Sequence, residues 1–151
     1  MRLDEIPGVG RATAEVIVAE VGTDMSRFPS AGHLASWAGM CPGHNERAGK
    51  RKSGRTRKGN HALRAAVVEA AHAAGRKNDS YLQAQYRRLA QRRGRKKAAV
   101  AVGHSILVIV YYLLSHPERS YADLGGDYFV ERDREALTRR SVDAWSAWAT
   151  R

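Results

Sequence analysis

Cysteine is almost absent from this chain, and its scarcity limits the available chemistry. Cys41 is the one cysteine in 151 residues, so an intrachain disulfide and a cysteine zinc site are both excluded. No signal peptide opens the chain. We therefore expect a cytoplasmic protein that works in a reducing compartment.

Strand signals and internal repeats are also missing, whereas helical patterns recur along the chain. The sequence predicts an all-α fold, in which a helix–hairpin–helix start is followed by a small helical bundle with a long basic loop. The length allows one domain with an appendage. We expect a domain over residues 1–116 and a charged helical tail over residues 117–151. Helices are predicted over residues 30–38, 60–74, 81–93, 98–114 and 130–148, the first two capped by Ser30 and Asn60.

One long apolar run, residues 98–114, is about the shortest that could cross a bilayer. Gly103, His104 and Ser105 lie near its middle. These residues favour a buried core helix, and no membrane partner is expected. In the tail, Trp145 and Trp148 are spaced to dock on the core.

Acidic residues are few, with 15 Asp and Glu against 26 Lys and Arg and a formal net charge of +11. The chain has no His-x-x-x-His pattern, no metal-spaced carboxylate pair on a basic face and no nucleotide-binding glycine loop. We expect neither a metal site nor a cofactor within this chain.

Basic residues gather in two segments. Seven of the twelve residues from Arg47 to Lys58 are basic and none is acidic. So much like charge in a glycine-rich, aperiodic segment indicates a polyanion partner, and nucleic acid is the obvious one. A second cluster of seven basic residues lies within residues 87–97. The predicted phosphate contacts in the first segment are Lys50, Arg51, Lys52, Arg55, Arg57 and Lys58.

Residues 6–10, Ile-Pro-Gly-Val-Gly, resemble the hairpin of a helix–hairpin–helix motif. The amides of Gly8 and Gly10 and the following helix N-terminus could hold a phosphate oxygen, and Arg11 could reinforce them. The alternative is a tight turn between two core helices that touches no DNA.

Several short motifs occur in a fixed order. They are Ile6-Pro7-Gly8-Val9-Gly10, Phe28, Leu34 to Gly39, Cys41-Pro42-Gly43, Gly49-Lys50, Gly54-Arg55, Lys58-Gly59-Asn60 and Leu63-Arg64. Their order and spacing resemble the C-terminal transposase domain of the insertion-sequence one-ten (one-sixteen/nine-zero-two) family, the transposases of bridge-RNA-guided elements. The match covers roughly residues 3–115.

This resemblance implies DNA transposition and recombination, with DNA, a guide (bridge) RNA or both as partners, and a homo-oligomer as one assembly. It also implies a separate N-terminal nuclease domain whose carboxylates bind magnesium. This chain has no room for such a domain, so it is expected to be an N-terminally truncated transposase.

The resemblance further implies a serine nucleophile in the basic segment, but Arg47 stands at the expected position. A guanidinium has no usable lone pair at neutral pH. Ser53 is the remaining catalytic candidate, and a turn or phosphate-binding role suits it better. Alone, the chain is expected to bind DNA without cutting it. Two rival interpretations remain, a stand-alone helix–hairpin–helix nucleic-acid-binding module without a recombinase role and a basic RNA-packaging protein.

Overall fold

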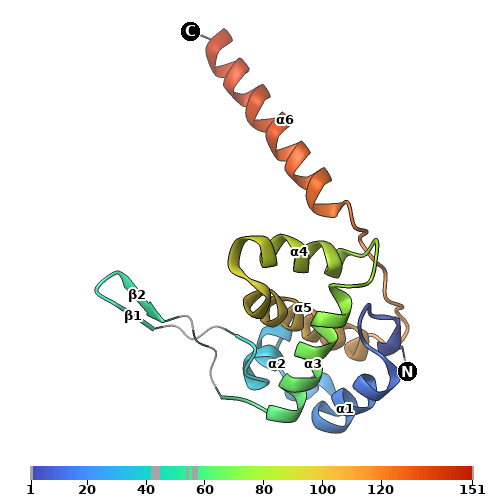
Figure 1. Cartoon of the computed structure of the whole chain (residues 1–151). Helices are drawn as coiled ribbons and strands as arrows, with labels where there is room; N and C mark the ends of the chain where they lie inside the picture. The colour runs from blue at the N-terminus through green and yellow to red at the C-terminus, as the bar shows by residue number, and fades with distance from the viewer. Residues whose placement is uncertain (1, 42–44, 54, 56–57, 151) are drawn as a thin grey trace.

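The computed structural model describes residues 2–41, 45–53, 55 and 58–150, and in this part of the chain helices dominate (Figure 1). The all-α prediction is confirmed, although one small β-hairpin lies in the basic segment. The elements in chain order are η1 (Leu3–Glu5, a 3-10 turn), α1 (Arg11–Val21), η2 (Met25–Arg27, a 3-10 turn), α2 (Ala31–Trp37), β1 (Asn45–Arg47), β2 (Lys50–Ser53), α3 (His61–Ala74), α4 (Tyr81–Arg93), α5 (Arg95–Ser115) and α6 (Tyr128–Ala149).

Three helices begin at side-chain caps, two of them at the predicted residues Ser30 and Asn60. The Ser30 hydroxyl accepts from the amide of His33 at 3.4 Å and starts α2. The Asn60 carboxamide oxygen accepts from the amide of Leu63 at 2.9 Å and starts α3. The Ser80 hydroxyl accepts from the amide of Gln83 at 3.1 Å and starts α4. Each cap satisfies an amide that would otherwise lack a partner, so these helix starts are encoded locally.

Helix α5 forms the centre of the core, with α2, α3 and α4 packed against it. Among the described helices it is long and apolar enough to cross a membrane, judged by length and composition only. In this fold the helix lies against three neighbours, which agrees with the predicted core helix. Its buried residues are Ala98, Ala99, Val102, Gly103, Ile106, Leu107 and Val110.

Helix α3 lies between α5 and α1, and its buried face is rich in alanine, with Ala70, Ala71 and Ala74 all buried. On one side, a Cβ added at Gly103 of α5 would lie 3.4 Å from the carbonyl oxygen of Val67. Small side chains at such contacts let backbones approach closely. Helix α3 and helix α5 therefore pack closely at Val67 and Gly103.

The first residues of the tail, before and at the start of α6, contact the helical body. Asp123 accepts hydrogen bonds from the amides of Tyr81 and Gly125, at 2.9 and 2.7 Å. The guanidinium groups of Arg88 and Arg132 lie over the ring of Phe129, at 5.2 and 5.0 Å from its centroid. These contacts fix the base of α6.

Beyond this base α6 projects away from the helical body (Figure 1). The structure buries none of its residues, and Trp145 and Trp148 are 68% and 70% exposed. The prediction that these two tryptophans dock on the core is wrong. Their rings pack on each other instead, with centroids 5.3 Å apart.

Candidate nucleic-acid interface

The described residues of the basic segment include a β-hairpin that lies away from the helical body, and residues 45–53, 55 and 58 are here called the basic arm (Figure 1). Its strands β1 and β2 pair antiparallel, with Arg47 opposite Lys50 and an irregularity between Asn45 and Glu46. The aperiodic loop that the sequence predicts is therefore partly a β-hairpin. Two residues join the strands, Ala48 and Gly49, and both have positive φ, at 54° and 74°.

The residues of this turn explain why the sequence does not predict the hairpin. Tight two-residue turns with positive φ at both positions usually carry Asn-Gly or Asp-Gly, since alanine rarely adopts that conformation. Ala48-Gly49 lacks that signature.

The turn places Arg47 and Lys50, both exposed, directly across from each other. Like charges in this position destabilise a strand pair by roughly 0.2–1 kcal/mol, and a neighbouring anion would relieve this repulsion.

The described residues that flank the basic arm on its two sides meet in a closely packed contact. A Cβ added at Gly59 would lie 2.3 Å from the amide nitrogen of Gly39 and 2.4 Å from the carbonyl carbon of Ala38. Only glycine lets the returning chain lie so close to the outgoing one. A guanidinium nitrogen of Arg64 also donates to the carbonyl of Gly39 at 3.1 Å. The basic arm therefore starts from a fixed position on the body.

The structure describes the predicted phosphate contacts unevenly. Lys50, Arg55 and Lys58 are exposed. Arg51, Lys52 and the catalytic candidate Ser53 belong to β2, but only their backbone is described. Arg57 lies outside the described residues. Arg47, at the position where a serine was expected, is the last residue of β1.

The N-terminal turn uses Gly8 for packing. Gly8 has φ +86°, and a Cβ there would lie 2.2 Å from the carbonyl oxygen of Ala70 and 2.6 Å from the amide nitrogen of Ala74. Ile6, Pro7 and Val9 around it are buried, so the turn rests on α3. The packing gives Gly8 a structural role that the predicted phosphate role did not include.

Gly10 and Arg11 fit the predicted phosphate role better. Gly10 is exposed and caps α1 without a side-chain bond, so the first amides of α1 have no cap from a side chain. Arg11 is exposed and pairs with Glu15, with Nε 3.1 Å from Oε1. Their part in nucleic-acid binding, and the helix–hairpin–helix assignment itself, stay predictions.

The two predicted binding elements lie at opposite ends of α3. The basic arm joins α3 at Asn60, whose side-chain Nδ2 donates to the carboxylate of Glu20, near the end of α1, at 2.7 Å. Gly8, in contrast, packs against Ala70 and Ala74. A helix rises about 1.5 Å per residue, so roughly 15–20 Å of α3 separates the two places. They do not form one compact site.

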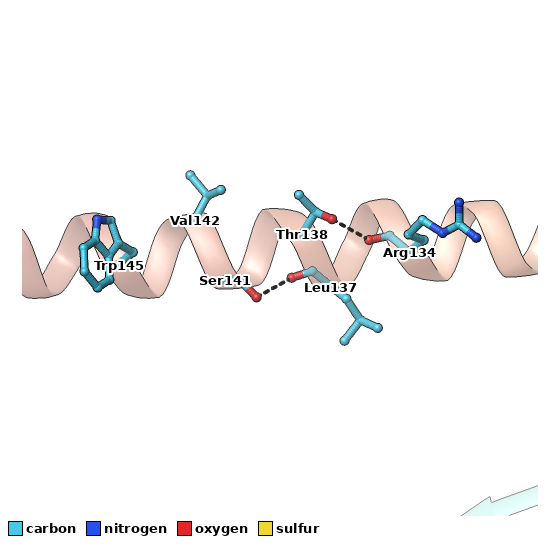
Figure 2. Close-up of a pocket in the computed structure, with 6 residues that line it drawn as sticks. All are labelled: Arg134, Leu137, Thr138, Ser141, Val142 and Trp145. Atoms are coloured by element: carbon cyan, nitrogen blue, oxygen red, sulfur yellow. Dashed lines mark hydrogen bonds between the residues drawn. The ribbon is translucent and has the colours of Figure 1, made fainter.

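A shallow groove runs along one face of α6, lined by Arg134, Leu137, Thr138, Ser141, Val142 and Trp145 (Figure 2). The hydroxyls of Thr138 and Ser141 donate to the carbonyls of Arg134 and Leu137, at 3.0 and 2.9 Å. One helix supplies the whole lining. Within the described part of the chain, no three His, Cys, Asp or Glu side chains gather where they could hold a metal ion.

Comparisons with known proteins place this architecture in a family. Residues 1–87 match the model of the transposase IS116/IS110/IS902 family. The chain is 31% identical over 121 residues to the transposase for insertion sequence element IS1111A of Coxiella burnetii (strain RSA 493 / Nine Mile phase I), which covers 78% of this chain and 33% of that protein. It is also 52% identical over 40 residues to the insertion element IS110 uncharacterized 43.6 kDa protein of Streptomyces coelicolor (strain ATCC BAA-471 / A3(2) / M145), over 26% of this chain and 10% of that protein.

Matches of this extent define a protein of the transposase class. The chain belongs to the transposase IS116/IS110/IS902 family. The resemblance seen in the sequence motifs is thereby confirmed. The match spans about a third of the length of the Coxiella burnetii transposase.

Proposed function

We propose that this chain is a DNA-binding part of an insertion-sequence transposase and that the basic arm holds the DNA backbone. The observation that carries the proposal is the placement of Arg47 opposite Lys50 at the exposed tip of a projecting hairpin. Exposed cations that oppose each other gain most from a phosphate backbone, which neutralises both and releases counterions.

The arm suits backbone binding rather than base reading. Phosphate contacts position a protein on a duplex without selecting sequence. We therefore expect binding that tolerates changes of DNA sequence and falls steeply with salt. If about five phosphates are contacted, log K should fall against log salt with a slope of roughly −4 to −5.

The test neutralises part of the arm. Replacing Lys50, Arg51 and Lys52 by glutamine should flatten the slope by roughly two to three, since each lost phosphate contact removes about 0.9. The matched control replaces three exposed arginines of α6, Arg134, Arg139 and Arg140, which changes net charge equally. An arm variant that keeps the wild-type slope would show that the arm is not the binding surface.

Strand cleavage is a separate part of the proposal. Phosphoryl transfer of this kind needs a nucleophile and a metal ion to neutralise developing charge. With Arg47 at the expected serine position, we expect this chain to bind an element-end DNA and not to cut it, with magnesium present. Arg47→Ser alone should not restore cutting, because the metal-binding carboxylates would still have to come from another domain. Cleavage by the wild type that disappears in Ser53→Ala would make Ser53 the nucleophile.

Guide RNA is the partner that competes with DNA for this surface. Its phosphate backbone offers the arm the same charge. Titration of the wild type with duplex DNA and with a structured RNA of equal length separates the two partners. Tighter RNA binding at the same salt would reassign the arm to the guide.

A further inference from the structure

The second basic cluster of the sequence forms a surface separate from the basic arm. Helices α4 and α5 meet at Gly94, and every residue from 91 to 97 is exposed. We call this surface the α4–α5 tip and define it by its five cations, Arg92, Arg93, Arg95, Lys96 and Lys97. The predicted site residues do not include any of them.

Three of these cations occupy a position that opposes helix stability. Arg95, Lys96 and Lys97 form the first turn of α5, where the partial charge of a helix is positive. Gly94 precedes them and supplies no side-chain cap. Helices α2, α3 and α4, in contrast, all start at a capping side chain. These three cations of the tip therefore lower the stability of α5 without a local benefit.

The neighbouring Arg88 has a structural role, and its contacts can be compared with those of the tip cations. Its guanidinium pairs with Asp133 at 2.7 Å and lies over the ring of Phe129. Among the described residues, the five cations of the tip make no comparable ion pair and no stacking contact. Their charge is available to a partner.

The tip is open and lies toward the arm. Gly94 has φ +88°, and an added Cβ would meet no atom within 4 Å. In Figure 1 the connection between α4 and α5 and the β1–β2 hairpin both lie on the left of the helical body. Met40, at the base of the arm, lies against Gly103, eight residues into α5 from Arg95. At about 1.5 Å per residue, this contact is roughly 12 Å along α5 from the tip.

We propose that the α4–α5 tip is a second binding surface for the phosphate backbone of a nucleic acid, distinct from the basic arm. The proposal goes beyond the proposed function, because it assigns a site that shares no residue with the arm. A duplex that contacted both surfaces would have more phosphates neutralised than the arm alone can reach. Each surface would then contribute its own share of the salt dependence.

The test compares three triple variants of the whole chain with glutamine at the exchanged positions. One changes the tip (Arg95, Lys96 and Lys97), one the arm (Lys50, Arg51 and Lys52), and the control changes α6 (Arg134, Arg139 and Arg140). Each is titrated with duplex DNA and with duplex RNA of the same sequence over a range of salt. The tip variant should lose roughly two to three units of slope on the nucleic acid it binds. The duplex, DNA or RNA, on which the tip variant loses more of the salt-dependence slope is the one whose phosphates the tip binds.

Stability supplies a second readout. Removing three cations from the first turn of α5 relieves repulsion by the helix dipole, so the melting temperature should rise by a few degrees while affinity falls. If the three cations only stabilised the fold, the melting temperature of the tip variant should fall instead. The combined tip and arm variant should show additive losses, because the two surfaces share no residues.

The outcomes separate the two proposals. If the arm variant binds weakly and the tip variant binds like the wild type, the inference fails and the proposed function stands. If both bind like the wild type, both fail. Should the tip variant unfold, Arg92→Gln with Arg93→Gln leaves α5 unchanged, and unaltered binding by that pair would also overturn the inference.

Discussion

The substitution Gly8→Ala tests the close contact between the N-terminal turn and α3. An alanine Cβ would lie 2.2 Å from the carbonyl oxygen of Ala70 and 2.9 Å from the Cβ of Ala74, so the turn would have to move away from α3. Positive φ costs alanine roughly 1–2 kcal/mol, and overpacking adds roughly 1–3 kcal/mol. We expect a loss of about 2–5 kcal/mol in the free energy of unfolding and a melting temperature roughly 5–20 °C lower.

Two other glycines serve as matched controls in thermal and urea denaturation. A Cβ at Gly10 meets nothing within 4 Å, so Gly10→Ala should cost less than about 1 kcal/mol through the cap alone. Gly32 lies exposed in α2, and Gly32→Ala should stabilise by roughly 0.5–1 kcal/mol. A Gly8→Ala protein as stable as Gly10→Ala would refute the packing role assigned to Gly8.

Acid should destabilise the domain through His104, because burial lowers the pKa of this half-buried imidazole below its ordinary value of 6.5. As the pH falls, the imidazole takes up a proton in the unfolded chain before it does so in the folded chain, so stability is lost below about pH 6.5. The melting temperature of His104→Gln should therefore fall less than that of the wild type between pH 7 and pH 5. At the base of α6, the hydrogen bond from Arg88 holds the pKa of Asp133 below its ordinary value. The attachment should therefore persist until the pH falls through that lowered pKa, whereas Asp133→Asn should speed amide exchange over residues 128–133 at neutral pH. Exchange over residues 45–53 should be fast in the free protein and slower with DNA, because an isolated two-stranded hairpin is marginal; strong protection without DNA would contradict this.

Most helices could be predicted because their signals are local. A capping residue and a periodic apolar face are both visible in a short window, and Ser30 and Asn60 start their helices as expected. The long apolar run from Ala98 to Leu114 forms the central helix for the same reason. The hairpin of the basic arm lacked such a signal, since Ala48 occupies a conformation in which alanine is rare.

The roles of Gly8 and of the two tail tryptophans could not be predicted from the residues next to them in the sequence. A glycine in a tight turn exposes amides or permits close packing, and the difference depends on whether α3 lies beside it. Similarly, Trp145 and Trp148 are spaced as a buried pair would be, but no other element of the described chain covers them. In each case the deciding contact is tertiary, between residues far apart in sequence.

The placement of the tryptophans determines what optical spectroscopy can report for this protein. Trp37 is 41% exposed, and the other two lie on α6 at 68% and 70%. No tryptophan is buried in the core around α5, so intrinsic fluorescence would follow the contact of Trp37 with the buried ring of Phe28 and the projecting helix. The tilted rings of Trp145 and Trp148, with centroids 5.3 Å apart, are close enough for exciton coupling. Their circular dichroism should report the helicity of α6 separately from the rest of the chain.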